Sequence, residues 1–349
     1  MNSEQHPYHC NDISKQTGMV VKTVGMHTGG GPLRIVISGF PKIVGKTLLD
    51  KRQYLLDHLD YQRRILLLEP RGHDAMYAAF LVEPDLPEAD MAVLFSYGET
   101  CSYMCGYATI ALGRFAIDYG LVKGVSPETV VKIQCPCGLV ATKVQYDDGK
   151  TGATRLQSVP CFVFATAVKV NVEKYNEVQC DIVFGGTFYA YADISQFGLN
   201  FGTASVKDII AVSMTTTKAV SSLVKPYHPE LTEASYISGT ILYENSLMEN
   251  TPVKFMLVYG DRHAERSGCG SGSCGFLALL HHKGLIRVDE LKTFVNGKTQ
   301  SQLTGRIVKT VTVKELPAVI TEVSGRAFYT GECTYYCEDD DTLPFLQLK

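Results

Sequence analysis

Hydrophobic residues recur at helical spacing in two stretches of the sequence, and each stretch begins at a Cys-Gly pair. One begins at Cys105-Gly106 and continues with Ala108, Ala111, Leu112, Phe115 and Ala116. The other begins at Cys269-Gly270 and contains an apolar run over residues 276–280. Apolar residues at i, i+3, i+4 and i+7 form one stripe along a helix. The pattern therefore predicts two helices, each of which buries such a stripe.

The surroundings of the two helices also match. Gly120 and Gly284 each follow their cysteine by 15 residues, at a position where a left-handed glycine ends a helix. A strand-like run, over residues 91–96 or 253–258, and a Tyr-Gly-acid turn precede each helix. The two cysteines are 164 residues apart. These repeats predict a duplicated chain with two lobes, each presenting a cysteine at the start of a central helix.

The rest of the pattern is mainly that of β-strands separated by turn signals, which with the helices indicates an α/β fold. Helical spacing returns over residues 46–68 and 205–225. The first of these segments is expected to be one surface helix, because charged residues occupy its other side. No Pro-, Gly- or Ser-rich linker separates the two halves, so a short hinge is expected near residues 160–170.

Composition narrows the classes of partner. The chain has 349 residues, 45% of them apolar and 20% charged, with a net charge of −3. This balance predicts no basic surface for nucleic acid or an anionic membrane, so a small molecule is the expected partner. Residues 1–16 are polar, and no apolar run approaches about 18 residues, which predicts a cytoplasmic protein without a membrane segment. The eleven cysteines are expected to stay reduced thiols.

A cysteine at the first turn of a helix has chemical meaning. The free N–H groups and the positive dipole end of the helix stabilise an anion there. The thiols of Cys105 and Cys269 are therefore expected to ionise below the ordinary pKa of about 8.5. If both face one cleft, one thiol removes a proton from a small molecule while the other waits on its opposite face.

Two other kinds of site compete for these residues. Residues 270–275 match G-x-G-x-x-G, and Asp289 follows at about the spacing of a ribose contact, but charged residues stand where a dinucleotide fold has a buried strand. Cys135 and Cys137 are a close thiol pair, but they lack the C-x-x-C spacing of a structural zinc site. We expect neither a metal nor a cofactor.

Five motifs resemble signatures of the proline racemase family: residues 26–30 (MHTGG), 69–73 (EPRGH), 104–106 (MCG), 185–190 (GGTFYA) and 266–272 (RSGCGSG). Across almost the whole chain the likeness points to the eukaryotic branch of that family, the trans-3-hydroxy-L-proline dehydratases. The resemblance implies the diaminopimelate-epimerase fold, with two pseudo-symmetric α/β lobes, a sheet wrapped around a central helix in each, and the active site between them. We expect residues 18–164 with 335–349 to form the N-terminal lobe, which carries Cys105, and residues 165–334 to form the C-terminal lobe, which carries Cys269.

The resemblance also implies a cofactor-independent mechanism. A cysteine thiolate removes the α-proton of an imino acid, whose carboxylate accepts hydrogen bonds from the N-termini of both central helices. The expected reaction is dehydration of trans-3-hydroxy-L-proline to pyrroline-2-carboxylate. The matching catalytic positions are Cys105 and Cys269, and the matching substrate-binding positions are Gly106, Tyr107, Glu265, Gly270 and Ser271.

Several positions depart from the family pattern. Cys269 stands where the dehydratases usually have threonine, and Tyr107 stands where histidine usually follows M-C-G. Glu265 replaces an aspartate, Gly268 a proline and Gly31 the glutamate of M-H-T-G-G-E-P. A two-cysteine proline racemase or hydroxyproline epimerase, favoured by Cys269, is therefore an alternative. A further alternative is a non-catalytic relative that binds an imino acid. The sequence does not determine the oligomeric state, and a homodimer is one possibility.

Overall fold

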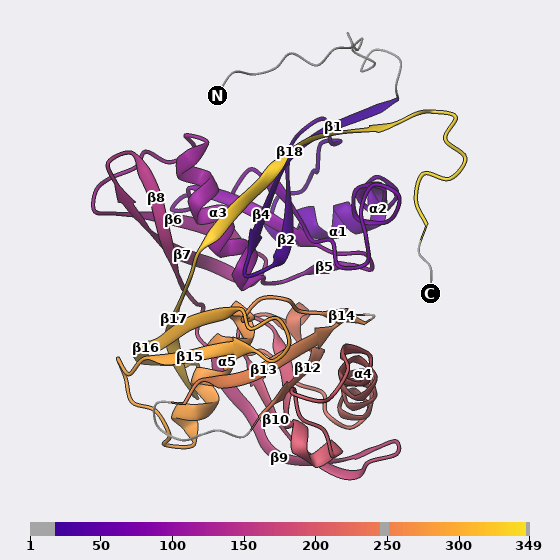
Figure 1. Cartoon of the computed structure of the whole chain (residues 1–349). Coiled ribbons are helices and arrows are strands. Elements are labelled where there is room, and N and C mark those ends of the chain that lie inside the picture. Colours follow the sequence, from indigo (N-terminus) through magenta and orange to yellow (C-terminus); the bar gives the residue numbers. More distant parts are fainter. Residues whose placement is uncertain (1–17, 245–250, 261, 347–349) are drawn as a thin grey trace.

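The computed structural model describes residues 18–244, 251–260 and 262–346. Figure 1 shows two bodies of similar build, one above the other. The upper body contains β1 (Met19–Thr28), β2 (Gly31–Ser38), α1 (Leu48–His58), α2 (Asp60–Leu67), β3 (Ala78–Val82), β4 (Met91–Ser96), β5 (Cys101–Ser102), α3 (Gly106–Asp118), β6 (Glu128–Cys135), β7 (Gly138–Asp147), β8 (Lys150–Gln157) and β18 (Ala327–Cys337). The lower body contains β9 (Phe162–Val172), β10 (Asn176–Phe184), β11 (Phe188–Asp193), η2 (Ile194–Phe197), α4 (Val206–Leu223), η3 (Thr232–Ala234), β12 (Ile237–Tyr243), β13 (Val253–Tyr259), β14 (His263–Ala264), α5 (Gly270–His282), β15 (Lys292–Asn296), β16 (Gln302–Val313) and β17 (Leu316–Gly325).

The strands of both bodies follow one order. In the upper body β18, β1, β2, β3, β4, β6, β7 and β8 lie side by side, with the pairs β2–β3 and β4–β6 parallel. In the lower body β9, β10, β11, β12, β13, β15, β16 and β17 repeat this order, with β11–β12 and β13–β15 parallel. Antiparallel pairing of β8 with β17 joins the two sheets. This repeat confirms the predicted two-lobed α/β fold.

The last strand of each repeat crosses to the other body. β9 follows β8 in sequence but pairs with β10, and β18 follows β17 but pairs with β1. The C-terminal tail stays on the upper body, where Arg71 donates to the carboxylate of Asp341 (2.8 Å). We propose a division in which β18 belongs to the N-terminal lobe. In this division the C-terminal return to the N-terminal lobe begins at Ala327 and not at the expected residue 335, because β18 pairs with β1. The second lobe begins at Phe162 and not at residue 165, because β9 pairs with β10.

The two central helices begin and end as the repeats predict. α3 and α5 start directly after Cys105 and Cys269, and each contains 13 residues. Gly120 (φ 72°) and Gly284 (φ 71°) follow them in the left-handed conformation. α3 packs against β1, β7 and β8, and α5 packs against β9, β16 and β17. Because strands surround them, both helices are buried on nearly all sides.

The other helical segments lie outside this centre. α4 confirms the helix expected over residues 205–225, and a capping box at Ser205 starts it. The single helix expected over residues 46–68 is wrong, because the chain breaks at Leu59 into α1 and α2. After the break, the Arg63 side chain is fully buried, bonded to Asp60 and donating to the carbonyl of Gly98 (3.0 Å). The many charged residues of this segment gave no indication that the Arg63 side chain points into the protein.

The two lobes also contact each other at the starts of α3 and α5. A Cβ atom added to Gly106 would lie 2.5 Å from the Cα atom of Gly270, and one added to Gly270 would lie 2.7 Å from the Cα atom of Gly106. Neither distance is compatible with a real side chain. Glycine at both positions therefore lets the N-termini of α3 and α5 touch through their backbones.

We expect Gly106→Ala to lower the free energy of unfolding by about 1–3 kcal/mol, because the added methyl group forces two packed helices apart. The measurement is chemical denaturation of both proteins. A suitable control is Gly202→Ala on an exposed turn, where the new Cβ atom would meet only the Asn200 side chain, at 3.1 Å. Equal effects of the two substitutions would show that the helix contact is not tight.

Candidate active site

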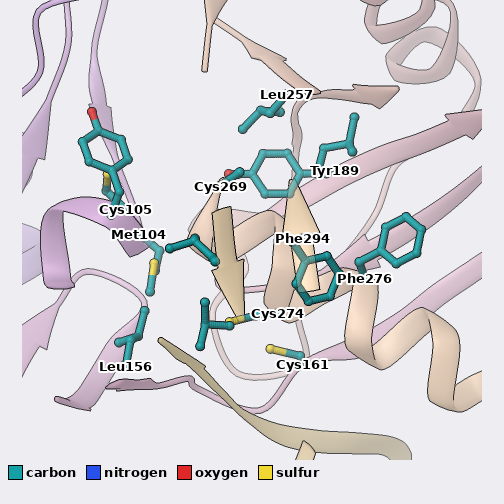
Figure 2. Packing of buried hydrophobic residues seen from close by; sticks show 14 of the residues in the cluster. Met104, Cys105, Leu156, Cys161, Tyr189, Leu257, Cys269, Cys274, Phe276 and Phe294 are labelled. Atoms are coloured by element: carbon teal, nitrogen blue, oxygen red, sulfur yellow. The ribbon is translucent and has the colours of Figure 1, made fainter. Parts of the chain in front are cut away.

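The helix starts open on a small cavity between the lobes. Its volume is about 30 Å³, so the lobes are closed on each other. Figure 2 shows Cys105 on the ribbon of the N-terminal lobe and Cys269 on that of the C-terminal lobe, with Tyr189 and Leu257 beside Cys269. The cavity is lined by every residue that the sequence suggested for the site: Cys105, Gly106, Tyr107, Glu265, Cys269, Gly270 and Ser271.

The Cys105 thiol is held in its neutral form. Burial raises its pKa, and the negative charge of Glu265 raises it further, whereas a hydrogen bond from the backbone of Ala108 lowers it. The helix start thus acts in the expected direction, but removal of the thiol from water outweighs it. The expectation of a lowered pKa is wrong for the closed cleft.

Cys269 has the same role in α5 but a different backbone. Its φ of 47° lies in the left-handed region, where the backbone of any residue other than glycine is strained. The φ of Cys105 is −141°, in the extended region. The Cys269 N–H donates to the Ser267 hydroxyl (3.0 Å), and the Asn296 amide donates to the carbonyl of Ser267 (3.0 Å). These bonds hold the strained loop. Burial and then Glu265 raise the pKa of the Cys269 thiol too.

Glu265 is the charged group at the centre of the site. Its Oε1 atom accepts hydrogen bonds from the backbone N–H groups of Arg266 (2.9 Å) and Ser267 (2.8 Å). Only 6% of the residue is exposed, and burial raises its pKa. Within the described part of the chain, no other charged side chain lines the cavity. A ligand with a cationic group therefore has one carboxylate to pair with.

Tyr107 lines the cavity two residues after Cys105, in the first turn of α3. Its hydroxyl donates to the carbonyl of Pro32 (3.2 Å), and its own carbonyl accepts a hydrogen bond from the hydroxyl of Thr28 (2.9 Å). Its ring lies 5.6 Å from that of Tyr77, at a tilt of 59°. The side chain is thus fixed from several directions.

Much of the cavity wall was missed by the sequence reasoning. Tyr97 and Tyr259 come from the two matched Tyr-Gly-acid turns, and their rings meet edge to face across the cleft, 5.4 Å apart. Beside them, Glu99 of the first turn bonds His263 of the other lobe (2.9 Å), whereas Asp261 of the second turn lies outside the described residues. The repeated turn was one signal available in the sequence, and the motifs at residues 104–106 and 185–190 were another, since they contain the wall residues Met104, Thr187 and Tyr189. No motif marked the other wall residues, which are Tyr77, Ser102, Tyr236, Ser238 and Leu257.

The structure also places the residues of the competing motifs. Residues 270–275 form the first turns of α5, and the Tyr191 hydroxyl donates to the carbonyl of Gly272 (2.9 Å). Among the residues that the structure describes, no three His, Cys, Asp or Glu side chains gather into a metal-binding group. The described helices include none long and apolar enough to span a membrane.

A family model described as proline racemase matches residues 23–346. The chain belongs to the proline racemase family. It is 43% identical to the trans-L-3-hydroxyproline dehydratase of Xenopus tropicalis, over 93% of this chain and 94% of that relative. It is also 43% identical to the trans-3-hydroxy-L-proline dehydratase of Homo sapiens, over 93% of both.

The solved structure of a hydroxyproline epimerase from Agrobacterium vitis, with bound trans-4-hydroxy-L-proline, superposes on this member of the proline racemase family with a TM-score of 0.88. The two proteins are 26% identical, and the match covers 95% of this chain and 96% of that one. The likeness confirms the diaminopimelate-epimerase type of fold expected from the sequence.

We expect Glu265→Gln to shift the reaction of Cys105 with iodoacetamide to lower pH. Because the Glu265 charge raises the pKa of the thiol, its removal lowers that pKa and the thiolate forms at lower pH. The pH profile is measured by mass spectrometry of the peptide that contains Cys105. Glu177→Gln, an exposed carboxylate of β10, serves as control. An unchanged or upward-shifted profile would show that the charge does not act on this thiol.

Proposed function

We propose that the protein dehydrates trans-3-hydroxy-L-proline to pyrroline-2-carboxylate, with Cys105 as the base. The observation that carries this proposal is the 43% identity to named dehydratases, which extends over 93% of the chain. The closure of both lobes on a cavity lined by two thiols supports it. Glu265, the one charged side chain that lines the cavity in the described part of the chain, favours a substrate with a cationic group.

The charges of the site match those of an imino acid. The substrate carboxylate lies at the touching helix starts, where the N–H groups of Gly106, Gly270 and Ser271 and two helix dipoles favour an anion. The secondary ammonium pairs with Glu265. This pairing offsets the negative charge that raises the pKa of Cys105, so the substrate itself favours formation of the thiolate.

The proton transfer follows from the stereochemistry of the substrate. In the trans isomer the hydrogen on C2 and the hydroxyl on C3 lie on the same face of the ring. Cys105 removes the proton from C2, the C2=C3 double bond forms, and the C3–O bond breaks. The new thiol returns the proton to the departing hydroxyl, which leaves as water, and the enamine then tautomerises to pyrroline-2-carboxylate. One thiol completes the cycle, and the cis isomer is predicted to be a poor substrate.

Cys269 favours epimerisation as the second candidate function. A thiol on the opposite face can protonate C2 and invert its configuration without loss of the hydroxyl. The two functions differ in what they require of Cys269. Dehydration on one face needs only Cys105, whereas epimerisation needs a proton donor at both positions.

Cys105→Ser should lower kcat/KM for trans-3-hydroxy-L-proline by at least about 100-fold, since the reaction loses its general base. Turnover is followed by NMR in deuterated water, which separates dehydration, epimerisation and inertness in one dataset. Cys137→Ser, a partly buried thiol outside the cavity lining, is the matched control. Activity of the Cys105 variant close to that of the control would remove Cys105 from the mechanism.

Cys269→Thr should preserve most of the dehydration, because a hydroxyl can fill the site while Cys105 carries the proton. The same substitution should suppress any epimerisation, since a hydroxyl is far less acidic than a thiol. Both rates are taken from the spectra of one reaction. Loss of dehydration in this variant, together with rapid epimerisation by the wild type, would replace the dehydratase assignment by that of an epimerase.

A further inference from the structure

Gly31, the first residue of β2, faces two groups of the active site. A Cβ atom added to Gly31 would lie 3.2 Å from Cδ2 and Cε2 of Tyr107 and 3.3 Å from Oε1 of Glu265. These distances are tighter than ordinary contacts between carbon and its neighbours. The Tyr107 ring and the Glu265 carboxylate thus occupy the space that a side chain at position 31 would need.

Neither neighbour can yield easily to such a side chain. The Tyr107 hydroxyl donates to the carbonyl of Pro32, directly after Gly31, and its ring packs on Tyr77. Glu265 is tied to two backbone N–H groups of its own loop. Tyr107 is only 3% exposed, and the cavity next to it holds about 30 Å³. Because Tyr107 lines this cavity, a ring displaced by a side chain at position 31 would move toward the space of the ligand.

We propose that Gly31 and Tyr107 act as one unit that selects the ring size of the substrate. Gly31 leaves the space in which the Tyr107 ring stands, and the ring narrows the Cys105 side of the cleft to a five-membered cyclic imino acid. A six-membered homologue carries one more methylene group, and the fixed Tyr107 ring opposes its entry. The proposal rests on the dehydration described above for its substrate class. The departures at positions 31 and 107 are then one change, since the tyrosine requires the glycine.

The link between the two positions is tested without substrate. Gly31→Ala should lower the midpoint of thermal unfolding in the wild-type background and lower it markedly less in a Tyr107→Ala background, where only the contact with the Glu265 carboxylate remains. Gly98→Ala is the matched control, because its Cβ atom would also meet a neighbour at 3.2 Å, the Leu68 side chain, and its effect should be equal in both backgrounds. An equal effect of Gly31→Ala in both backgrounds would overturn the unit.

Ring selection is tested by comparing trans-3-hydroxy-L-proline with trans-3-hydroxy-L-piperidine-2-carboxylate, its six-membered homologue. Tyr107→Ala should lower the ratio of kcat/KM for the two substrates at least about tenfold, since one methylene group in a tight pocket is worth about that much. If this variant is inactive, the ratio of the dissociation constants of L-proline and L-piperidine-2-carboxylate, measured by calorimetry, should fall likewise. An unchanged ratio would overturn the selective role of Tyr107.

These experiments separate the present proposal from the assignment of the reaction. A wild-type protein that does not act on trans-3-hydroxy-L-proline contradicts the dehydratase function. The thermal and calorimetric comparisons still decide whether Gly31 and Tyr107 form a unit and whether that unit selects a five-membered ring.

Discussion

The backbone contact between Gly106 and Gly270 is the constraint on which the site depends. Two helices that touch at their N-termini direct two positive dipole ends and two sets of free N–H groups at one point. The contact also fixes Cys105 and Cys269, the residues just before each helix, on either side of that point. Any side chain at the contact would separate the thiols and spread the N–H groups. The arrangement of the two lobes and the chemistry of the cleft therefore both depend on the absence of side chains at Gly106 and Gly270.

Among the described residues that line the cavity, Glu265 has no side chain of opposite charge beside it. Glu265 contributes a buried negative charge, and both thiols are neutral because burial raises the pKa of each. In the proposed complex, the cation of a zwitterionic substrate pairs with Glu265 and its anion lies at the helix starts. On this proposal, the thiolate of Cys105 forms when the substrate binds.

The sequence predicted those features that are encoded locally and repeated. The Cys-Gly starts, the terminating Gly120 and Gly284 and the 164-residue offset were enough to place α3, α5 and the lobes. The tyrosines that line the cavity were not predicted as a group, because they lie far apart in the chain and come together only in the folded two-lobed structure. The direction of the pKa change at Cys105 also depends on this closure. The left-handed backbone of Cys269 has no local signature, because the loop around it, held by Asn296, imposes the conformation.

The crossing of β9 and β18 has a consequence for the history of the chain. Each repeat ends in a strand that completes the sheet of the other repeat, and β18 closes a circle begun by β1. A half-length polypeptide would leave its own first strand without this neighbour and would carry an unpaired strand at its end. Two such polypeptides could satisfy each other only by exchanging these ends, as in a domain-swapped dimer. The present chain has the arrangement that results when the genes for two exchanged subunits are fused.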